Sequence, residues 1–434
     1  MKPSSKKYTA RSATAVIVAN MIGTGVFASL GFQLLEIQSG FAILMLWAVG
    51  GLTALCGALS YAELGSAMPQ GGGEYNFLSK IYHPLVGFVT GWVSTTIGFA
   101  APVAVVAILF AGYFTQVYPI VDVKILAIGL ILLLTAIHIT NHKSSGAFHQ
   151  IMTLFKLLLI IGFSGFAYFI VDQPQTISFL PHSDDFDVVF SGSFAVTLIF
   201  VNYAFMGWNS ATYISSEIEN PQKSLPRILL TGTLIVAILY VILNFIFLYV
   251  APINELVGVK EVGYVAAKHV FGPQGAAIMS VSLSVVLIST VSAMTIAGPR
   301  AFQAIGKDYP VFSKLAKTNK NEIPVNAILL QSSLSILFIS TSSFEFILIF
   351  ASFTLGLSNF ATVLGVFVLR KTQPNLKRPY KTWLYPITPI LYLCLMGWTL
   401  IYIIKDKPQE ALMSFGVIFL GIIMYFVSKK LEKH

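Results

Sequence analysis

Two glycines and a polar side chain interrupt the first long apolar stretch of this chain. In the run NMIGTGVF, Asn20 is followed by Gly23, Thr24 and Gly25, where a helix in an apolar environment would otherwise continue. Backbone N–H and C=O groups that a break leaves without partners are costly in hydrocarbon, so a break persists only inside protein or beside a wet cavity. The run therefore predicts a broken helix with main-chain groups free for chemistry.

The freed groups suit a small molecule that carries both charges. The N–H groups that open the half-helix after Gly25, together with the positive end of its dipole, favour a carboxylate. The carbonyl groups that end the preceding half, with those of a second break, suit an ammonium. The alternative interpretation is that the small residues only let two helices pack closely.

A second interruption lies in the run FVNYAFMGWNSATY. Asn202, Gly207 and Asn209 occur there within otherwise apolar and aromatic residues. This segment is also predicted to be a helix with a broken middle.

The elements that carry both interruptions are predicted to be membrane-spanning helices. The 434 residues are 56% hydrophobic and 10% charged, and the mean hydropathy is +0.79. A water-soluble protein could not carry this composition without large exposed apolar patches. Twelve apolar windows are long enough to cross about 30 Å of hydrocarbon as helices. They begin near residues 13, 41, 84, 123, 149, 188, 227, 274, 325, 345, 383 and 411.

The positions of the two interruptions predict an internal repeat. They fall in the first and sixth spans, and because five is an odd number of crossings, the two spans would enter the membrane from opposite sides. We therefore expect an all-α membrane protein built from two inverted five-helix repeats and two further helices. The expected divisions are a cytoplasmic N-terminal segment 1–11, a first repeat 12–172, a second repeat 188–370, helices 11 and 12 in 383–428, and a cytoplasmic tail 429–434.

The basic residues predict the orientation of the chain. Of the 27 lysines and arginines, 21 lie next to spans on the side of the N-terminus and five lie on the other side, so both termini are predicted to be cytoplasmic. The net charge of +9 then reflects topology and attraction to anionic lipid rather than nucleic-acid binding. Cys56 and Cys394 both fall within predicted spans, which leaves no disulfide framework and no metal cluster.

The remaining basic residue is Lys156, near the middle of the fifth span in TLFKLLLII. It lies too deep to reach the membrane surface easily, so its side chain is predicted to face the protein interior. Burial disfavours the charged form, which suggests a group that takes and releases a proton. The alternative is a permanently charged structural clamp.

Four motifs resemble those of the amino acid, polyamine and organocation permeases, especially their bacterial L-type amino acid exchanger branch. They are MIGTGVF in the first span, SYAELGSAMPQGGGEY after the second, GWNSATYISSEIENPQKSLPRIL leaving the sixth and AGPRAFQAIGKD at the end of the eighth. The resemblance covers nearly the whole chain. It implies the leucine-transporter fold, with twelve helices, and sodium-independent amino acid exchange or proton-coupled uptake in a bacterial inner membrane.

The same resemblance implies a substrate site. The carboxylate-binding motif falls on Gly23, Thr24 and Gly25, with Asn20, Met21 and Ile22 on the side that receives the amino group. An aromatic gate falls on Tyr203, and its backbone carbonyl, with those of Ala204 and Met206, would complete the ammonium site. Pocket residues would be Asn209 and, on the third span, Ser94, Thr95 and Phe99, although hydroxyls on that span are nearly as often contacts between helices.

The resemblance also gives Lys156 a role. It implies that the ammonium replaces the sodium ion of related transporters and reaches carbonyls near Gly23 and hydroxyls of the eighth span. The candidate hydroxyls are those of Ser289, Thr290 and Ser292.

Differences from relatives favour neutral amino acids as substrates. Arginine/agmatine exchangers have an acid where this chain has Asn209 and a tryptophan where it has Ala293. Without that acid, a cationic side chain would be buried unpaired. Polyamines lack the carboxylate that the first span is predicted to hold. A cationic amino acid or polyamine antiporter is the alternative within the family.

Other classes of membrane protein fit less well. An embedded enzyme would need converging catalytic groups, and the sequence has no HExxH motif, no GxSxG motif and no pair of aspartates within spans. A channel subunit would not require two broken helices. We therefore expect a transporter in the lipid bilayer that binds an amino acid, with protons as the candidate coupled ion and without a cofactor or metal.

Three further ionisable residues are assigned provisional roles. Glu63 and Glu74 flank GSAMPQGGG and are expected to cap the interface or to form gate ion pairs, and His138 is expected to pack with its ring nitrogens satisfied.

Animal relatives are joined to a heavy chain through a cysteine between the third and fourth spans. This chain has none there, so no disulfide-linked heavy chain is expected.

Overall fold

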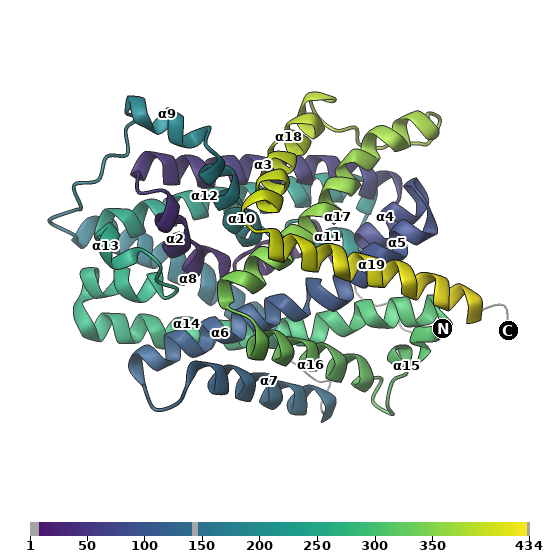
Figure 1. Ribbon diagram of the computed structural model, residues 1–434, viewed down its shortest axis with the longest axis horizontal. Coiled ribbons are helices and arrows are strands. Elements are labelled where there is room, and N and C mark those ends of the chain that lie inside the picture. The colour runs from purple at the N-terminus through teal and green to yellow at the C-terminus, as the bar shows by residue number, and fades with distance from the viewer. Residues whose placement is uncertain (1–7, 141–145, 432–434) are drawn as a thin grey trace.

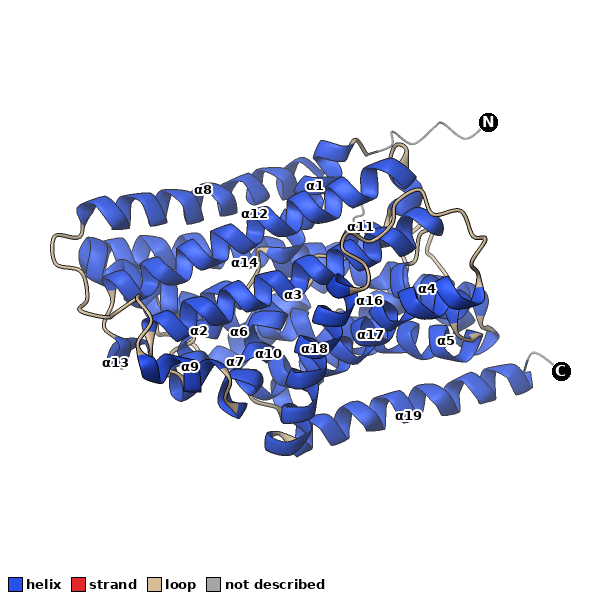
Figure 2. Cartoon of the chain, turned by 90° about the horizontal axis from the view of Figure 1, so that it is seen from above, coloured by secondary structure: helices blue, strands red, loops and turns tan. Residues whose placement is uncertain are grey.

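The computed structural model describes residues 8–140 and 146–431. Within these residues the regular structure is helical, apart from one isolated bridge between Tyr8 and Ile218 (Figures 1 and 2). Five basic residues used in the orientation argument lie outside the described residues, namely Lys2, Lys6, Lys7, Lys143 and Lys433.

The helices have the following bounds in chain order. They are α1 (Ala10–Met21), α2 (Gly25–Glu36), α3 (Gly40–Ala67), α4 (Gly73–Ile81), α5 (Pro84–Val93), η1 (Ser94–Gly98), α6 (Ala100–Val117), α7 (Val123–Thr140), α8 (Gly146–Ile170), α9 (Ser183–Val189), α10 (Gly192–Ala204), α11 (Ser210–Tyr213), η2 (Ser215–Glu217), α12 (Pro221–Val250), α13 (Ile253–Leu256), α14 (Val262–Asp308), η3 (Pro310–Phe312), α15 (Ser313–Ala316), α16 (Val325–Thr341), α17 (Phe344–Thr372), α18 (Ile387–Asp406) and α19 (Pro408–Leu431).

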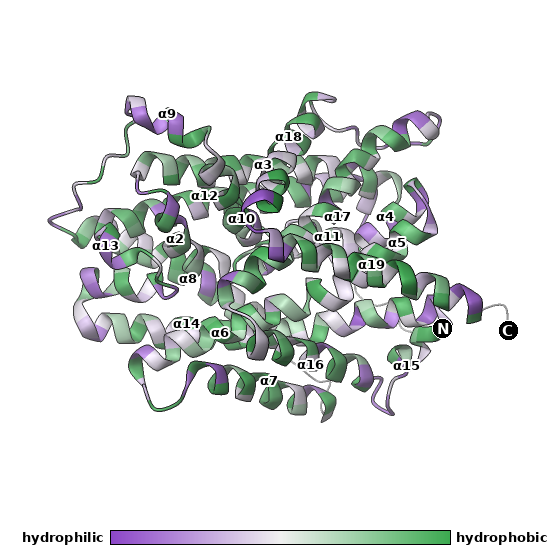
Figure 3. Ribbon diagram, in the orientation of Figure 1, coloured by the Kyte–Doolittle hydropathy of each residue, from purple (hydrophilic) through white to green (hydrophobic). Residues whose placement is uncertain are grey.

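Apolar helices dominate the bundle. Ten segments of the described chain are long and apolar enough to cross a membrane, and the bent pair α9 and α10 makes an eleventh if it counts as one span. At the place of the predicted ninth span, α16 is a shorter apolar helix. Hydrophobic residues run along the long helices, as Figure 3 shows. The all-helical membrane class is confirmed, whereas the count of twelve spans, the inverted repeat and the domain divisions stay predictions.

Both predicted helix breaks are present. In the first span, α1 ends at Met21 and α2 begins at Gly25. In the sixth, α10 ends at Ala204 and α11 begins at Ser210. Between them, Gly207 has a φ of +100°, a conformation that glycine adopts without the strain a side chain would cause.

Two further irregularities were not predicted from the sequence. The third span contains a π-helical turn, η1, between α5 and α6, and such turns occur frequently at functional sites. The long helix α14 is kinked at Gly272, where φ is +70° and a proline follows. The predicted eighth span corresponds to the part of α14 after this kink.

A buried carboxylate ties the second span to the tenth. Arg370 of α17 donates two hydrogen bonds to Glu63 of α3, at 2.8 Å and 2.7 Å. The backbone N–H and the hydroxyl of Thr382 both donate to the same carboxylate at 2.7 Å, and Arg378 lies 3.5 Å from it. Glu63 is therefore an ion-pair partner that fixes the segment between α17 and α18.

Glu63→Ala is expected to destabilise the protein. Removing one partner of a buried ion pair leaves the other charge uncompensated, which costs about 3–5 kcal/mol. Glu345→Ala is the matched control, because Glu345 forms a partly exposed pair with Lys407 and should contribute at most about 1 kcal/mol. Unfolding of both variants in detergent measures the difference, and equal losses of stability would contradict this role of Glu63.

Candidate functional site

The two helix breaks lie directly against each other. A Cβ atom built on Gly25 would lie 2.3 Å from the Cα atom of Ala204. A Cβ atom on Gly207 would lie 3.1 Å from the carbonyl carbon of Asn20. Since real side chains do not approach backbone at 2.3 Å, the contact at residue 25 requires a glycine.

The start of α2 presents main-chain donors at this contact. The N–H groups of Phe27 and Ala28 donate to the carbonyl of Thr24, each at 3.1 Å. The N–H groups of Gly25 and Val26 open the helix, and as first-turn donors they have no acceptor within it. The positive end of the helix dipole lies at the same place, so this terminus favours an anion.

Tyr203 lies beside the same terminus. Its side chain is buried and lies beside the Thr24 side chain. The residue predicted as an aromatic gate and a residue of the predicted carboxylate motif are therefore neighbours.

A hydroxyl that the sequence analysis missed joins the two breaks. The Tyr240 hydroxyl of α12 lies 2.6 Å from the carbonyl oxygen of Met21 and 3.1 Å from that of Ala204. These are two of the carbonyls predicted to receive an ammonium. The sequence does show a single tyrosine in the apolar run ILYVIL, but nothing in that run specifies the hydrogen-bond partners of its hydroxyl.

Lys156 points into the protein beside the first break. Its side chain is 6% exposed, whereas Leu154 and Leu158 on the same helix are 58% and 59% exposed. The ammonium donates to the Thr290 hydroxyl at 2.8 Å and to the Ile22 carbonyl at 3.3 Å. The predicted inward orientation is confirmed, and Thr290 is the hydroxyl that it contacts.

The other two candidate hydroxyls on α14 have different positions. Ser292 is hydrogen-bonded to His138 of α7 at 3.0 Å. Ser289 is buried on the same helix. His138 thus packs between helices with a polar partner, as expected.

The predicted pocket residues of the third span make local or unexpected contacts. Thr95 donates to the carbonyl of Trp92 at 2.9 Å, which satisfies its hydroxyl within its own span. Ser94, at the start of η1, lies beside the Tyr213 side chain. The contact of Ser94 joins the third span to the end of α11.

Asn209 also has an unexpected partner. Its amide nitrogen donates to Glu74 of α4, and the Tyr61 hydroxyl donates to the same carboxylate oxygen at 2.9 Å. Glu74 is 3% exposed, so it is a buried carboxylate and not the interfacial cap that its position in the sequence suggested.

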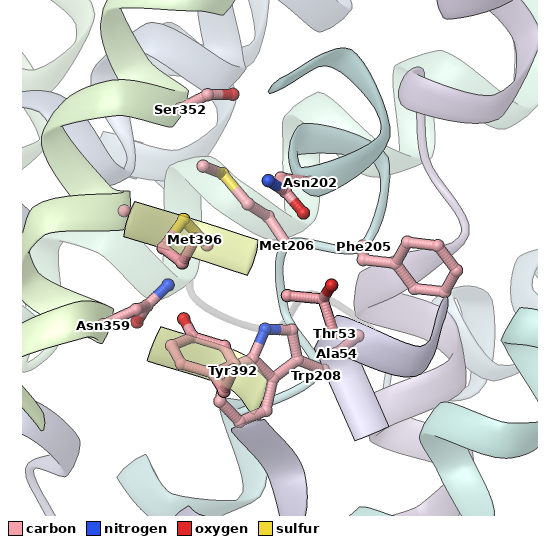
Figure 4. A pocket seen from close by; sticks show the side chains of 11 residues that line it. Thr53, Ala54, Asn202, Phe205, Met206, Trp208, Ser352, Asn359, Tyr392 and Met396 are labelled. Atoms are coloured by element: carbon pink, nitrogen blue, oxygen red, sulfur yellow. The ribbon is translucent and has the colours of Figure 1, made fainter. Parts of the chain in front are cut away.

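A small cavity lies next to the second break. Its volume is about 20 Å³, enough for roughly one water molecule. Its polar lining comes from α3, α10, α17 and α18 (Figure 4). The side chains that provide it are Thr53, Asn202, Ser352, Asn359 and Tyr392.

The described residues include no group of three or more His, Cys, Asp or Glu side chains placed to hold a metal ion. The polar groups that the structure places at the two breaks are main-chain carbonyls and N–H groups, the Tyr240 and Thr290 hydroxyls and the Lys156 ammonium.

Comparison with known proteins places the chain in a family. The sequence model described as amino acid permease matches residues 9–427. The chain is 28% identical to the large neutral amino acids transporter small subunit 2 of Oryctolagus cuniculus, over 96% of this chain and 79% of that protein. It is 29% identical to the serine/threonine exchanger SteT of Bacillus subtilis, over 96% and 95%.

A third relative is the b(0,+)-type amino acid transporter 1 of Mus musculus, 26% identical over 96% of this chain and 86% of that protein. The family match covers nearly all of the chain, and these relatives are transporters rather than enzymes. This protein is therefore an integral membrane protein that belongs to the amino acid permease family.

Proposed function

We propose that this protein moves neutral L-amino acids across the membrane by alternating access, without sodium, by exchange or proton symport. The contact between the two broken helices is the observation that carries the proposal. It packs the first residue of α2, Gly25, against Ala204, and the carbonyls of Met21 and Ala204 share the Tyr240 hydroxyl as a neighbour. Such a site matches the two charges of an amino acid.

The proposed pose follows from these dipoles. The substrate carboxylate binds the N–H groups at the start of α2, next to Thr24 and Tyr203. Its ammonium binds the carbonyls of Met21 and Ala204, where it competes with the Tyr240 hydroxyl for the same lone pairs. Asn20, Ile22, Gly23 and Met206 lie on the adjoining backbone.

Neutral side chains are favoured because the buried carboxylate bonded to Asn209 already accepts hydrogen bonds from neutral donors. Glu74 accepts hydrogen bonds from Tyr61, Asn209 and Tyr213, and Asn209 stands between it and the second break. A cationic side chain would have to displace these donors. The b(0,+)-type relative keeps a cationic substrate as the alternative, which uptake of arginine would support.

The contacts of Lys156 support independence from sodium. Its ammonium already uses the Ile22 carbonyl and the Thr290 hydroxyl. A metal cation at this place would lose those ligands and be repelled. We further propose a bacterial inner membrane with both termini cytoplasmic, and no disulfide-linked heavy chain, since the connection between α6 and α7 contains no cysteine.

Proteoliposomes loaded with neutral amino acids are expected to take up labelled neutral amino acid faster than empty ones, with no sodium present. Exchange or proton coupling both predict transport under these conditions, and an imposed pH gradient separates the two. Absence of uptake for every amino acid tested, with and without a gradient, would contradict the proposal.

Gly25→Ala is expected to weaken substrate binding by at least about tenfold, because the new methyl group collides with the Ala204 backbone and separates the two breaks. Gly23→Ala is the matched control, since the nearest atom to its Cβ would be the Met21 oxygen at 3.9 Å. Equilibrium binding of labelled substrate to purified protein measures both. Equal affinities in the two variants would contradict the assignment of the site.

Lys156→Ala is expected to remove the alkaline part of the pH dependence of uptake while binding is partly retained, because the amine that contacts the first break at Ile22 is lost. Thr290→Val, which keeps the amine and removes one acceptor, should shift this dependence without abolishing it. Initial uptake rates across a pH series measure the effect. An unchanged profile in Lys156→Ala would restore the interpretation of Lys156 as a structural clamp.

A further inference from the structure

Glu74 is a buried carboxylate held by neutral donors. It lies in the first turn of α4 and accepts hydrogen bonds from Tyr61 of α3, Asn209 and Tyr213 of α11. None of the ion pairs formed by the described residues includes it. A buried charge without a nearby cation costs free energy, so burial favours the protonated, neutral form of this carboxyl group.

The glycines that precede Glu74 bring α4 and α11 together. The N–H group of Gly72 donates to the Tyr213 carbonyl at 3.3 Å. A Cβ atom on Gly71 would lie 2.9 Å from the Tyr213 carbonyl oxygen, and a Cβ atom on Gly73 would lie 2.8 Å from the Tyr213 ring. The motif PQGGGEY after the second span therefore packs directly against the motif GWNSATY that leaves the sixth, and Glu74 lies at their junction. We call this contact between α4 and α11 the clasp.

The hydrogen bonds around Glu74 are complete in two proton arrangements. The Tyr61 hydroxyl lies 2.9 Å from both a Glu74 oxygen and the Asn359 side-chain oxygen, but it has one hydrogen to donate. With Glu74 ionised, Tyr61 donates to Glu74. With Glu74 protonated, the carboxyl group donates to Tyr61, which in turn donates to Asn359. One proton can therefore be added while every hydrogen-bond donor around Glu74 keeps an acceptor.

The small cavity places polar, hydratable space next to this network. Asn359 and Tyr392 both line it, as Figure 4 shows. Three buried polar atoms of its lining make no hydrogen bond within the described protein, namely Asn202 Nδ2, Ser352 Oγ and the Tyr392 hydroxyl. A cavity of this size with such partners suits a water molecule, which gives the network a proton donor and acceptor.

We propose that Glu74 is a second proton-binding site of this protein, separate from Lys156, and that its protonation releases α11 from α4. One proton from the aqueous phase adds to one carboxylate oxygen, and no other bond forms or breaks. The added proton removes the negative charge that strengthens the hydrogen bonds from Tyr213 and Asn209, and hydrogen bonds to a neutral carboxyl group are weaker than those to a carboxylate. The clasp between α4 and α11 is thereby weakened.

The direction of the pH dependence follows from the surroundings of Glu74. Burial raises the pKa of its carboxyl group, and the hydrogen bonds from Tyr213, Tyr61 and Asn209 oppose this in part. The ionised, clasped form is therefore present at high pH and is lost as the pH falls through the raised pKa. The titratable groups that face it are tyrosines, namely Tyr61, Tyr213 and Tyr392.

Infrared difference spectra of purified protein across a pH series test the protonation directly. Wild type should show the band of a buried carboxylic acid that appears as the pH falls, and Glu74→Gln should reduce its intensity. Asp308→Asn is the matched control, because Asp308 also accepts a tyrosine hydroxyl, from Tyr75 at 2.6 Å, but is exposed. A band of unchanged intensity in Glu74→Gln, or one that is reduced in Asp308→Asn instead, would overturn the proposal.

Tyr213→Phe gives a second test that does not remove the carboxyl group. Hydrogen bonds to a carboxylate favour its ionised form, so loss of this donor should move the midpoint of the band by about one pH unit or more toward higher pH. An unchanged midpoint would overturn the proposal as well.

The release of α11 is measured by labelling of a cysteine. In a Cys394→Ser background, Ala211→Cys places a thiol on α11 at a site that is buried in the clasped form. At one fixed high pH, adding Glu74→Gln should increase its labelling rate several-fold, because the amide mimics the protonated side chain. Equal rates with and without Glu74→Gln would overturn the release step.

The proposal rests on the transport function only in taking release of α11 as a step of transport. The infrared and labelling measurements need no substrate. If both give the expected result while no amino acid is taken up, the proposed function fails and the proton site stands. If uptake is found while the infrared band and the labelling rate are unaffected by Glu74→Gln, the proposed transport function stands and the proton site at Glu74 fails.

Discussion

The contact between the backbones of Gly25 and Ala204 is the constraint on which the rest of this structure depends. Two helices that each break inside an apolar bundle leave main-chain groups without partners, and in such surroundings each group must be satisfied by protein, water or ligand. Packing one break against the other puts the donors of one helix and the acceptors of both in a single small region. A side chain at residue 25 would separate them.

The protein satisfies the two kinds of freed group unequally. Carbonyls at the breaks have internal donors close by: the one hydrogen of the Tyr240 hydroxyl is shared between Met21 and Ala204, and the Lys156 ammonium donates to Ile22. The first N–H groups of α2 have no acceptor within their helix. An arrangement of this kind is stable when empty, because its acceptors are occupied, and it still offers an anion-binding terminus to a ligand.

Sequence patterns predicted features that depend on a single segment, such as helix breaks, and missed contacts between side chains of two distant segments. Polar residues and glycines inside apolar runs predicted both breaks, and a charge in the middle of a span predicted the inward orientation of Lys156. The partners of Tyr240, Asn209 and Glu74 were missed because they lie in distant parts of the chain, and periodicity does not fix how one helix is rotated against another. The π-helical turn η1 was missed because hydroxyl side chains and the nearby Gly91 and Gly98 are equally compatible with an ordinary α-helix packed against its neighbours.

A structure of this protein with a neutral amino acid bound tests the central claim most directly. The account predicts the ligand carboxylate within hydrogen-bond distance of the N–H groups of Gly25 and Val26, and its amino group at the carbonyls of Met21 and Ala204. The account would be contradicted by a ligand bound away from both breaks, or by first and sixth spans that continue as unbroken helices around it.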